Sequence, residues 1–156
     1  MSDANPEVPK ILDSIKVFSG RVFEVTVDTV QEGSVTYQRE VVHHSGSAVI
    51  IPVFDDDTVA LVKQYRHPAV RYLLEAPAGT LNDKERPDVG AARELEEELG
   101  LVAGNLEKLT EFFVSPGFCE EKMWVYLATE LTKTTQRLED DAVSYTHLTL
   151  PTIYSV

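Results

Sequence analysis

Residues 79–101 read Gly-Thr-Leu-Asn-Asp-Lys-Glu-Arg-Pro-Asp-Val-Gly-Ala-Ala-Arg-Glu-Leu-Glu-Glu-Glu-Leu-Gly-Leu, and this stretch decides how the rest of the chain is interpreted. Its second half predicts a helix with Asp88, or a residue one or two positions away, as N-cap, and with Gly100 in the left-handed position after the last turn. At about 100° per residue, one side of this helix is apolar and can pack on a core. That side carries Ala92, Leu95 and Leu99.

Three carboxylates lie on another side of the same helix, since Glu94, Glu97 and Glu98 stand at positions i, i+3 and i+4. Like charges at this spacing repel each other unless a cation lies over them. A hard divalent ion with oxygen ligands, Mg²⁺ or Mn²⁺, is the simplest such cation, and it also binds substrate phosphates. This side therefore predicts phosphate chemistry. The alternative is a glutamate-rich face that is only solvated.

Two neighbours of the carboxylates support a metal site. Gly79 follows Pro77-Ala78, so the backbone can turn there and bring a nearby carbonyl to the same ion. Arg93 lies one helical turn before Glu97, where its guanidinium can orient carboxylates without displacing the metal.

The whole stretch resembles the Nudix box, Gly-x5-Glu-x7-Arg-Glu-U-x-Glu-Glu-x-Gly-U, in which U is bulky and aliphatic. So many matches within 23 residues disfavour the solvated-face alternative. The matching positions are Gly79, Glu85, Arg93, Glu94, Leu95, Glu97, Glu98, Gly100 and Leu101.

The flanking sequence is similar to the ADP-ribose pyrophosphatases among the Nudix hydrolases. Gln64-Tyr65-Arg66 and Leu74–Gly79 precede the box, and Ser115-Pro116-Gly117-Phe118 follows it. The resemblance extends from about residue 15 to about residue 142. It implies an α/β/α sandwich around a mixed sheet, and hydrolysis of ADP-ribose to AMP and ribose 5-phosphate. It leaves two alternatives: another sugar nucleotide such as GDP-mannose as substrate, or a non-catalytic domain that senses a nucleotide.

The resemblance also implies roles for individual residues. Glu94 and Glu98 would be the primary ligands of Mg²⁺ or Mn²⁺, with Glu97 sharing the ion and the Ala78 carbonyl as a further ligand. Glu85 would support these ligands, and Arg93 would orient Glu97 through an ion pair.

The general base and the substrate contacts are assigned less directly. Glu139 and Glu121 are two candidates for the base, and the alternative for each is a surface carboxylate. Arg66 is expected to clamp a phosphate, unless it forms a structural ion pair. Arg39 is expected at the nucleotide end of the substrate, and the motif positions Gly79 and Pro116 complete the substrate-binding set. We interpret His43, His44 and His67 as structural or solvent-facing.

Composition sets limits on partners and location. The chain has 156 residues, a formal net charge of −12 and a single cysteine. Such an acidic protein is not suited to electrostatic binding of nucleic acid or anionic membranes. The resemblance implies a small nucleotide as its partner. The N-terminus lacks the apolar segment of a signal peptide, and a lone cysteine allows no internal disulfide. We therefore expect a cytoplasmic protein, and the resemblance implies a homodimer.

The pattern along the chain predicts an α+β domain. Alternating or continuous apolar runs predict several strands, and a hairpin turn is expected at Glu32-Gly33. Residues 1–10 are expected to be a loose tail, with the catalytic domain over 11–142. The predicted strands cover 15–19, 21–30, 34–43, 48–54, 58–65, 72–75, 106–114 and 122–129.

Residues 143–156 do not continue the family pattern. They have no helical periodicity, and Pro151 would interrupt a helix. The segment resembles translated adapter sequence, so we expect native sequence to stop near Ala142 and the C-terminal helix of the family to be missing. The alternative is a genuine terminus rich in β-structure.

Overall fold

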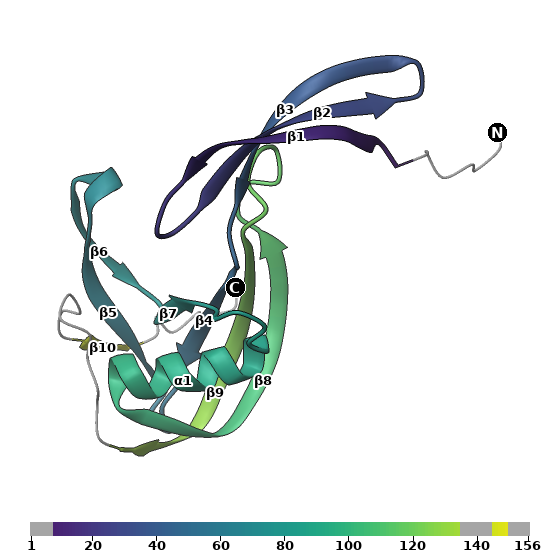
Figure 1. Ribbon diagram of the computed structural model, residues 1–156. Coiled ribbons are helices and arrows are strands. Elements are labelled where there is room, and N and C mark those ends of the chain that lie inside the picture. Colours follow the sequence, from purple (N-terminus) through teal and green to yellow (C-terminus); the bar gives the residue numbers. More distant parts are fainter. Residues whose placement is uncertain (1–7, 135–144, 150–156) are drawn as a thin grey trace, which may run out of the picture. The chain divides into compact units, whose positions relative to one another are not determined.

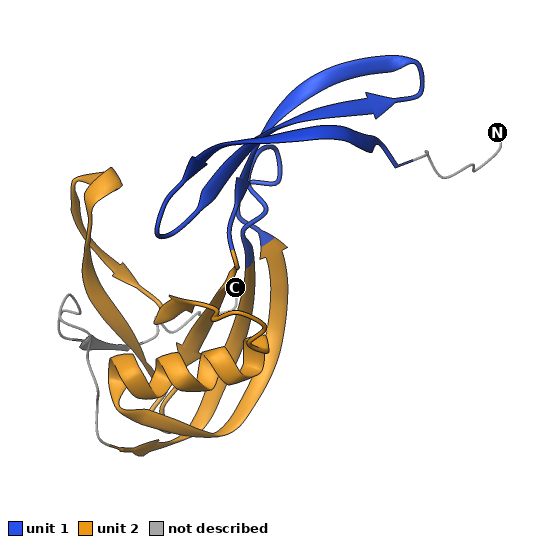
Figure 2. Cartoon of the chain, in the orientation of Figure 1, with its two compact units in different colours: residues 1–44, 113–122 blue, residues 45–112, 123–156 orange. Residues whose placement is uncertain are grey.

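The computed structural model describes residues 8–134 and 145–149. These residues belong to two compact units (Figure 2). The first unit takes residues 1–44 and 113–122, and the second takes residues 45–112 and 123–156. In the described part, strands and one α-helix together give the mixed α/β character that the sequence predicts.

The first unit contains a three-stranded antiparallel sheet in the order β1-β2-β3 (Figure 1). Its strands are Lys10–Ser19, Glu24–Glu32 and Val35–His43. The expected β2–β3 hairpin is confirmed, and Gly33 takes the left-handed conformation with φ of +58° that few other residues adopt in such a turn. Strand β1 begins at Lys10, so it is longer than the predicted strand and includes the last residue of the predicted tail.

The second unit contains two sheets. The first has the order β7-β4-β9-β8, in which β4 and β9 run parallel and β4 and β7 run antiparallel. These strands are Ala78–Thr80, Ser47–Pro52, Lys122–Lys133 and Leu101–Phe113. The second sheet is antiparallel, in the order β10-β5-β6. Its strands are Tyr145–Thr149, Thr58–Arg66 and Arg71–Glu75, and a 3-10 turn over His67–Ala69 joins the last two.

The helix α1 spans Pro87–Leu99 and ends at Gly100, whose φ of +62° and N–H bond to the Glu96 carbonyl confirm the predicted C-terminal cap. The N-cap lies two residues before Asp88, at the limit of the predicted range. Arg86 occupies that position, and Asp88 lies inside the first turn. The reason is Pro87, whose fixed φ and missing N–H suit the first helical position.

The core of the second unit lies between α1 and the sheet that contains β4 and β9 (Figure 1). Leu95 and Leu99 are buried as predicted, but Ala92 is exposed and Ala91 takes its place on the buried side. Ala91 stands one turn before Leu95 and two turns before Leu99, so the three lie on one stripe. Helical periodicity alone does not predict which of the two adjacent alanines is buried, because packing against β4 sets the rotation of the helix about its axis.

Replacement of Leu95 by alanine tests this core. Leu95 is fully buried, so the variant should lose about 2–5 kcal/mol of unfolding free energy through lost transfer energy and a new cavity. Urea unfolding followed by circular dichroism measures the loss. Val89→Ala on the same helix is the matched control, since Val89 is 49% exposed and should cost well under 1 kcal/mol. Equal costs for the two variants would contradict the packing described here.

The structure describes only residues 145–149 of the C-terminal segment. Tyr145–Thr149 forms a strand that pairs with β5, from Tyr145 opposite Val62 to Thr149 opposite Thr58. The proposed end of native sequence near Ala142, the remaining tail and Glu139 lie outside the described residues. Among the described residues, no helix has the length and apolarity needed to cross a membrane.

Candidate active site

The acidic side of α1 lies beside β7 and β5, and Glu98 links all three elements. One carboxylate oxygen of Glu98 accepts a hydrogen bond from the Ala78 backbone N–H at 3.2 Å. The other accepts from the Gln64 side-chain amide, also at 3.2 Å. Gln64 was quoted in the sequence only as a flank of the motif, and no local pattern indicated this contact.

Arg93 gathers the other carboxylates. Its Nε and Nη2 donate to the two oxygens of Glu85 at 2.9 and 3.0 Å. Its Nη1 donates to Glu94 at 2.6 Å and to Glu97 at 2.8 Å. The ion pair with Glu97 is therefore present, and the same guanidinium also holds two carboxylates that the sequence did not connect to it.

The pKa values of Glu85 and Glu98 are shifted in opposite directions. Hydrogen bonds from Arg93 and from the Asn82 backbone lower the pKa of Glu85 to about 2. Burial, followed by the negative charge of Glu94, raises the pKa of Glu98 to about 7, although the Ala78 N–H, Gln64 and Arg66 act in the opposite direction. Glu98 is thus only partly ionised at neutral pH.

Gly79 makes room for Glu94. A Cβ atom built on Gly79 would lie 1.9 Å from Oε1 of Glu94, far inside any real contact. Glu94 is itself buried, with 8% of its surface exposed. The close approach of β7 to the helix therefore requires a residue without a side chain.

The donor chemistry of this cluster fits a hard dication, since it offers carboxylate oxygens and a buried group with a raised pKa. As the side chains lie, however, no group of three or more His, Cys, Asp or Glu side chains in the described ranges is arranged to hold a metal ion. Arg93 keeps Glu94 and Glu97 on its guanidinium instead. A metal would need these two carboxylates to turn toward Glu98.

The predicted substrate residues are divided between the two units. Arg66 belongs to the second unit and donates to both oxygens of Glu75, which is the ion pair foreseen as its alternative role. Arg39 belongs to the first unit, where its guanidinium lies 4.1 Å from the Tyr37 ring centroid. Pro116 and Glu121 lie in the loop Val114–Glu121 of the first unit, hereafter the 114–121 loop.

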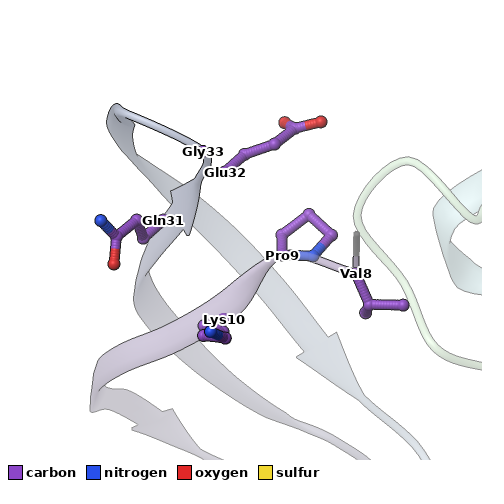
Figure 3. Close-up of a pocket in the computed structure, with 6 residues that line it drawn as sticks. All are labelled: Val8, Pro9, Lys10, Gln31, Glu32 and Gly33. Carbon is purple, nitrogen blue, oxygen red and sulfur yellow. The ribbon is translucent and has the colours of Figure 1, made fainter. Parts of the chain in front are cut away.

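A cavity of about 120 Å³ lies in the first unit where the start of β1 meets the β2–β3 hairpin turn (Figure 3). It contains none of the site residues predicted from the sequence, and it has no part in the candidate active site. Its lining is Val8, Pro9, Lys10, Gln31, Glu32 and Gly33.

Replacement of Arg93 by lysine should loosen the acidic cluster. A lysine offers a point charge in place of the planar fork that now contacts three carboxylates, so we expect a loss of about 1–2 kcal/mol at pH 7. The pKa of Glu85 is lowered in the folded protein, so the stability from this contact is present above about pH 4.5 and is lost as the pH falls toward 2. Urea unfolding at pH 7 and pH 3 should show a smaller difference between variant and wild type at pH 3.

The matched control for this substitution is Arg86→Lys. Arg86 pairs with Asp88 at the surface, with 75% of its side chain exposed, so its replacement should change stability by less than about 0.5 kcal/mol. An equal loss from both lysine variants would mean that Arg93 is an ordinary surface charge.

Comparison with known proteins supports the resemblance of the sequence to the Nudix hydrolases. A family model described as NUDIX domain matches residues 44–150. An ADP-ribose pyrophosphatase of Bacillus subtilis (strain 168) is 39% identical over 133 residues, which cover 85% of this chain and 72% of that protein. A methanol dehydrogenase activator of Bacillus methanolicus is 38% identical over 145 residues, covering 90% of this chain and 78% of the relative. A solved structure described as an ADP compounds hydrolase superposes with a TM-score of 0.76 at 24% identity, covering 90% of this chain and 76% of that chain.

Proposed function

The chain belongs to the Nudix hydrolase family, and from that premise we propose that it hydrolyses the diphosphate bond of ADP-ribose to AMP and ribose 5-phosphate. The observation that carries the proposal is the cluster on α1, in which Glu94 and Glu98 face β7 and Arg93 holds Glu94 and Glu97. The similarity to an ADP-ribose pyrophosphatase supports the choice of substrate.

We assign the metal ligands to Glu94, Glu97, Glu98 and the carbonyl of Ala78, with Mg²⁺ or Mn²⁺ as the ion. When bound, the ion screens phosphate charge and lowers the pKa of the attacking water. Glu98 is already held in place by Ala78 and Gln64. Arg93 keeps Glu94 and Glu97 within one helical turn of it, so modest side-chain rotations would bring the carboxylates together.

The remaining roles are proposals of the same kind. Arg66 would exchange its contact with Glu75 for a substrate phosphate, which its planar fork suits. Arg39 and Pro116 would contact the substrate. Either Glu121 or Glu139 would take the proton of the attacking water.

A homodimer is part of the proposal. Strand β1 is exposed along its whole length and carries uncovered apolar side chains, including Ile11, Ile15 and Phe18, of which 49–65% is exposed. Apolar surface on this scale is typical of an interface, and a second copy that packs or exchanges these strands would cover it. Sedimentation equilibrium of the purified protein would detect the dimer.

The deciding experiment is a panel of diphosphate substrates with the purified chain. ADP-ribose and GDP-mannose are each incubated with Mg²⁺, with Mn²⁺ or with EDTA, and the released nucleoside monophosphate is measured by chromatography. We expect AMP from ADP-ribose only when the metal is present. Faster release of GMP from GDP-mannose would move the assignment to that substrate. Tight binding of ADP-ribose without product would instead indicate a nucleotide sensor.

A further inference from the structure

Hydrogen bonds join β1 to β2, and β2 through β3 to the 114–121 loop. Ser14 Oγ donates to Asp28 at 2.6 Å. Thr26 Oγ1 lies 2.9 Å from Nε2 of His43, and Nδ1 of His43 lies 3.0 Å from the Glu120 carboxylate. Thr26 and Asp28 are buried, with 8% and 6% exposed, although the strands around them are open to solvent.

His43 uses both ring nitrogens to join β2 to the 114–121 loop. Nδ1 can donate to the Glu120 carboxylate while Nε2 accepts from the Thr26 hydroxyl, so the two contacts are compatible with each other.

Acidic side chains face His43 from two elements of the first unit. Glu24 and Asp28 act on it from β2, where Glu24 lies opposite His43 in the strand register. Glu120 faces it from the 114–121 loop. The cation in this neighbourhood is Lys16, which forms an ion pair with Glu24 at 2.6 Å. The acidic groups therefore outnumber the basic one.

The backbone brings Glu120 to this place. Val42 N–H donates to the Phe118 carbonyl at 2.7 Å, and Glu120 N–H donates to the Val42 carbonyl at 3.0 Å. The loop is closed by a bond from Val114 N–H to the Glu121 carbonyl at 3.0 Å. The neighbouring His44 lies 3.8 Å from the Glu121 carboxylate. Two adjacent histidines at the end of β3 thus face two adjacent glutamates of the loop.

We propose that His43 is a positioning residue, which fastens the 114–121 loop to β3 through Glu120 and thereby fixes Glu121. The consequence for catalysis rests on the proposed function, in which Glu121 is a candidate base. The fastening itself does not, because it is a property of the folded first unit. Removal of the His43 imidazole should release this link and loosen the loop.

Cys119 provides a probe for this inference. It is the chain's single cysteine, it lies in the loop next to Glu120, and its sulfur accepts a bond from the Glu121 N–H at 3.4 Å. We expect His43→Gln and Glu120→Gln each to react with 4,4′-dithiodipyridine about threefold to fivefold faster than wild type. The double variant should react no faster than either single one, because both remove the same link. His67→Gln is the matched control and should leave the rate unchanged.

The comparison is repeated at several pH values. The ratio of the wild-type rate to the His43→Gln rate at the same pH cancels the ionisation of the thiol itself. This ratio should be about one third at each pH between 5.5 and 8. Equal rates at all pH values, or additive effects in the double variant, would overturn the inference. If His43→Gln folds poorly, the labelling rate of Glu120→Gln tests the inference instead. Glu120 is a surface residue, so its replacement should leave the fold intact.

A kinetic arm separates this inference from the proposed function. If the wild type hydrolyses ADP-ribose, His43→Gln should lower kcat with KM changed less than about twofold. Faster labelling with an unchanged kcat would remove the catalytic consequence assigned to His43. A wild type that releases no AMP would refute the proposed function, while the labelling rates would still decide whether His43 fastens the loop.

Discussion

Replacement of Glu98 by glutamine should abolish metal-dependent turnover and, in the same protein, raise the stability of the metal-free form at pH 8. Burial and the charge of Glu94 raise the pKa of Glu98 from 4.5 to about 7. The folded state therefore holds this proton more tightly than the unfolded state. The corresponding stability is complete below about pH 4.5 and is lost as the pH rises through 7.

Glutamine keeps the shape of the side chain and removes the charge. Its amide oxygen can still accept from Ala78, and the Gln64 amide can turn to accept from its NH₂ group. We expect the variant to gain about 1–3 kcal/mol at pH 8 in EDTA and nothing at pH 4.5. Turnover of ADP-ribose with Mg²⁺ should fall by about a thousandfold, a loss of roughly 4 kcal/mol in transition-state stabilisation.

Calorimetric unfolding at the two pH values and AMP release measure the two effects. The matched control is Glu96→Gln, because Glu96 is on the same helix at a position that the motif leaves unspecified. It removes the same charge from α1 and should change neither result. Full turnover by the Glu98 variant would dismiss the ligand assignment, and equal stability gains at both pH values would show that burial of charge is not the cause.

The helix and its carboxylates were predictable because their signals are local. Glycine is the residue that most often ends a helix in the left-handed conformation, so Gly100 indicated where the helix stops. The spacing of Leu95 and Leu99 depends on helical geometry alone. The start of the helix was predictable only to within two residues because two local signals competed, and Pro87 at the first position took precedence over Asp88 as a cap. The pair Arg93–Glu97 was predictable for the same reason, since it spans four residues of one helix.

The other contacts of the site depend on pairings between distant segments. Glu85 reaches Arg93 only because the chain between β7 and α1 turns back through the Asn82–Glu85 contacts. Gln64 reaches Glu98 because β5 lies beside the helix, at a separation of 34 residues. The contact of His43 with Glu120 was not predicted, because the two residues are 77 positions apart in the sequence. No periodicity in one segment can indicate such contacts.

Replacement of Gly79 by alanine should reduce turnover by about a hundredfold or more while costing only about 1 kcal/mol of stability. The backbone at Gly79 has no positive φ, so alanine causes no strain of its own there. Its Cβ would lie 1.9 Å from Oε1 and 2.0 Å from Cδ of Glu94, so this carboxylate must move. The end of a glutamate side chain moves at low cost, which keeps the fold intact, but Glu94 would leave the position from which we expect it to bind metal.

The Glu94→Ala background isolates this mechanism. Without the carboxylate, the methyl group that the Gly79→Ala substitution adds has space, so this substitution should cause no further loss of stability in that variant. Gly117→Ala is the matched control, since nothing lies within 4 Å of its added Cβ, and it should leave thermal unfolding unchanged. We would measure AMP release and the midpoint of thermal unfolding for each of these variants and the wild type. Undiminished turnover in Gly79→Ala would mean that Glu94 can bind metal from more than one position, and that the close approach of β7 to α1 serves packing alone.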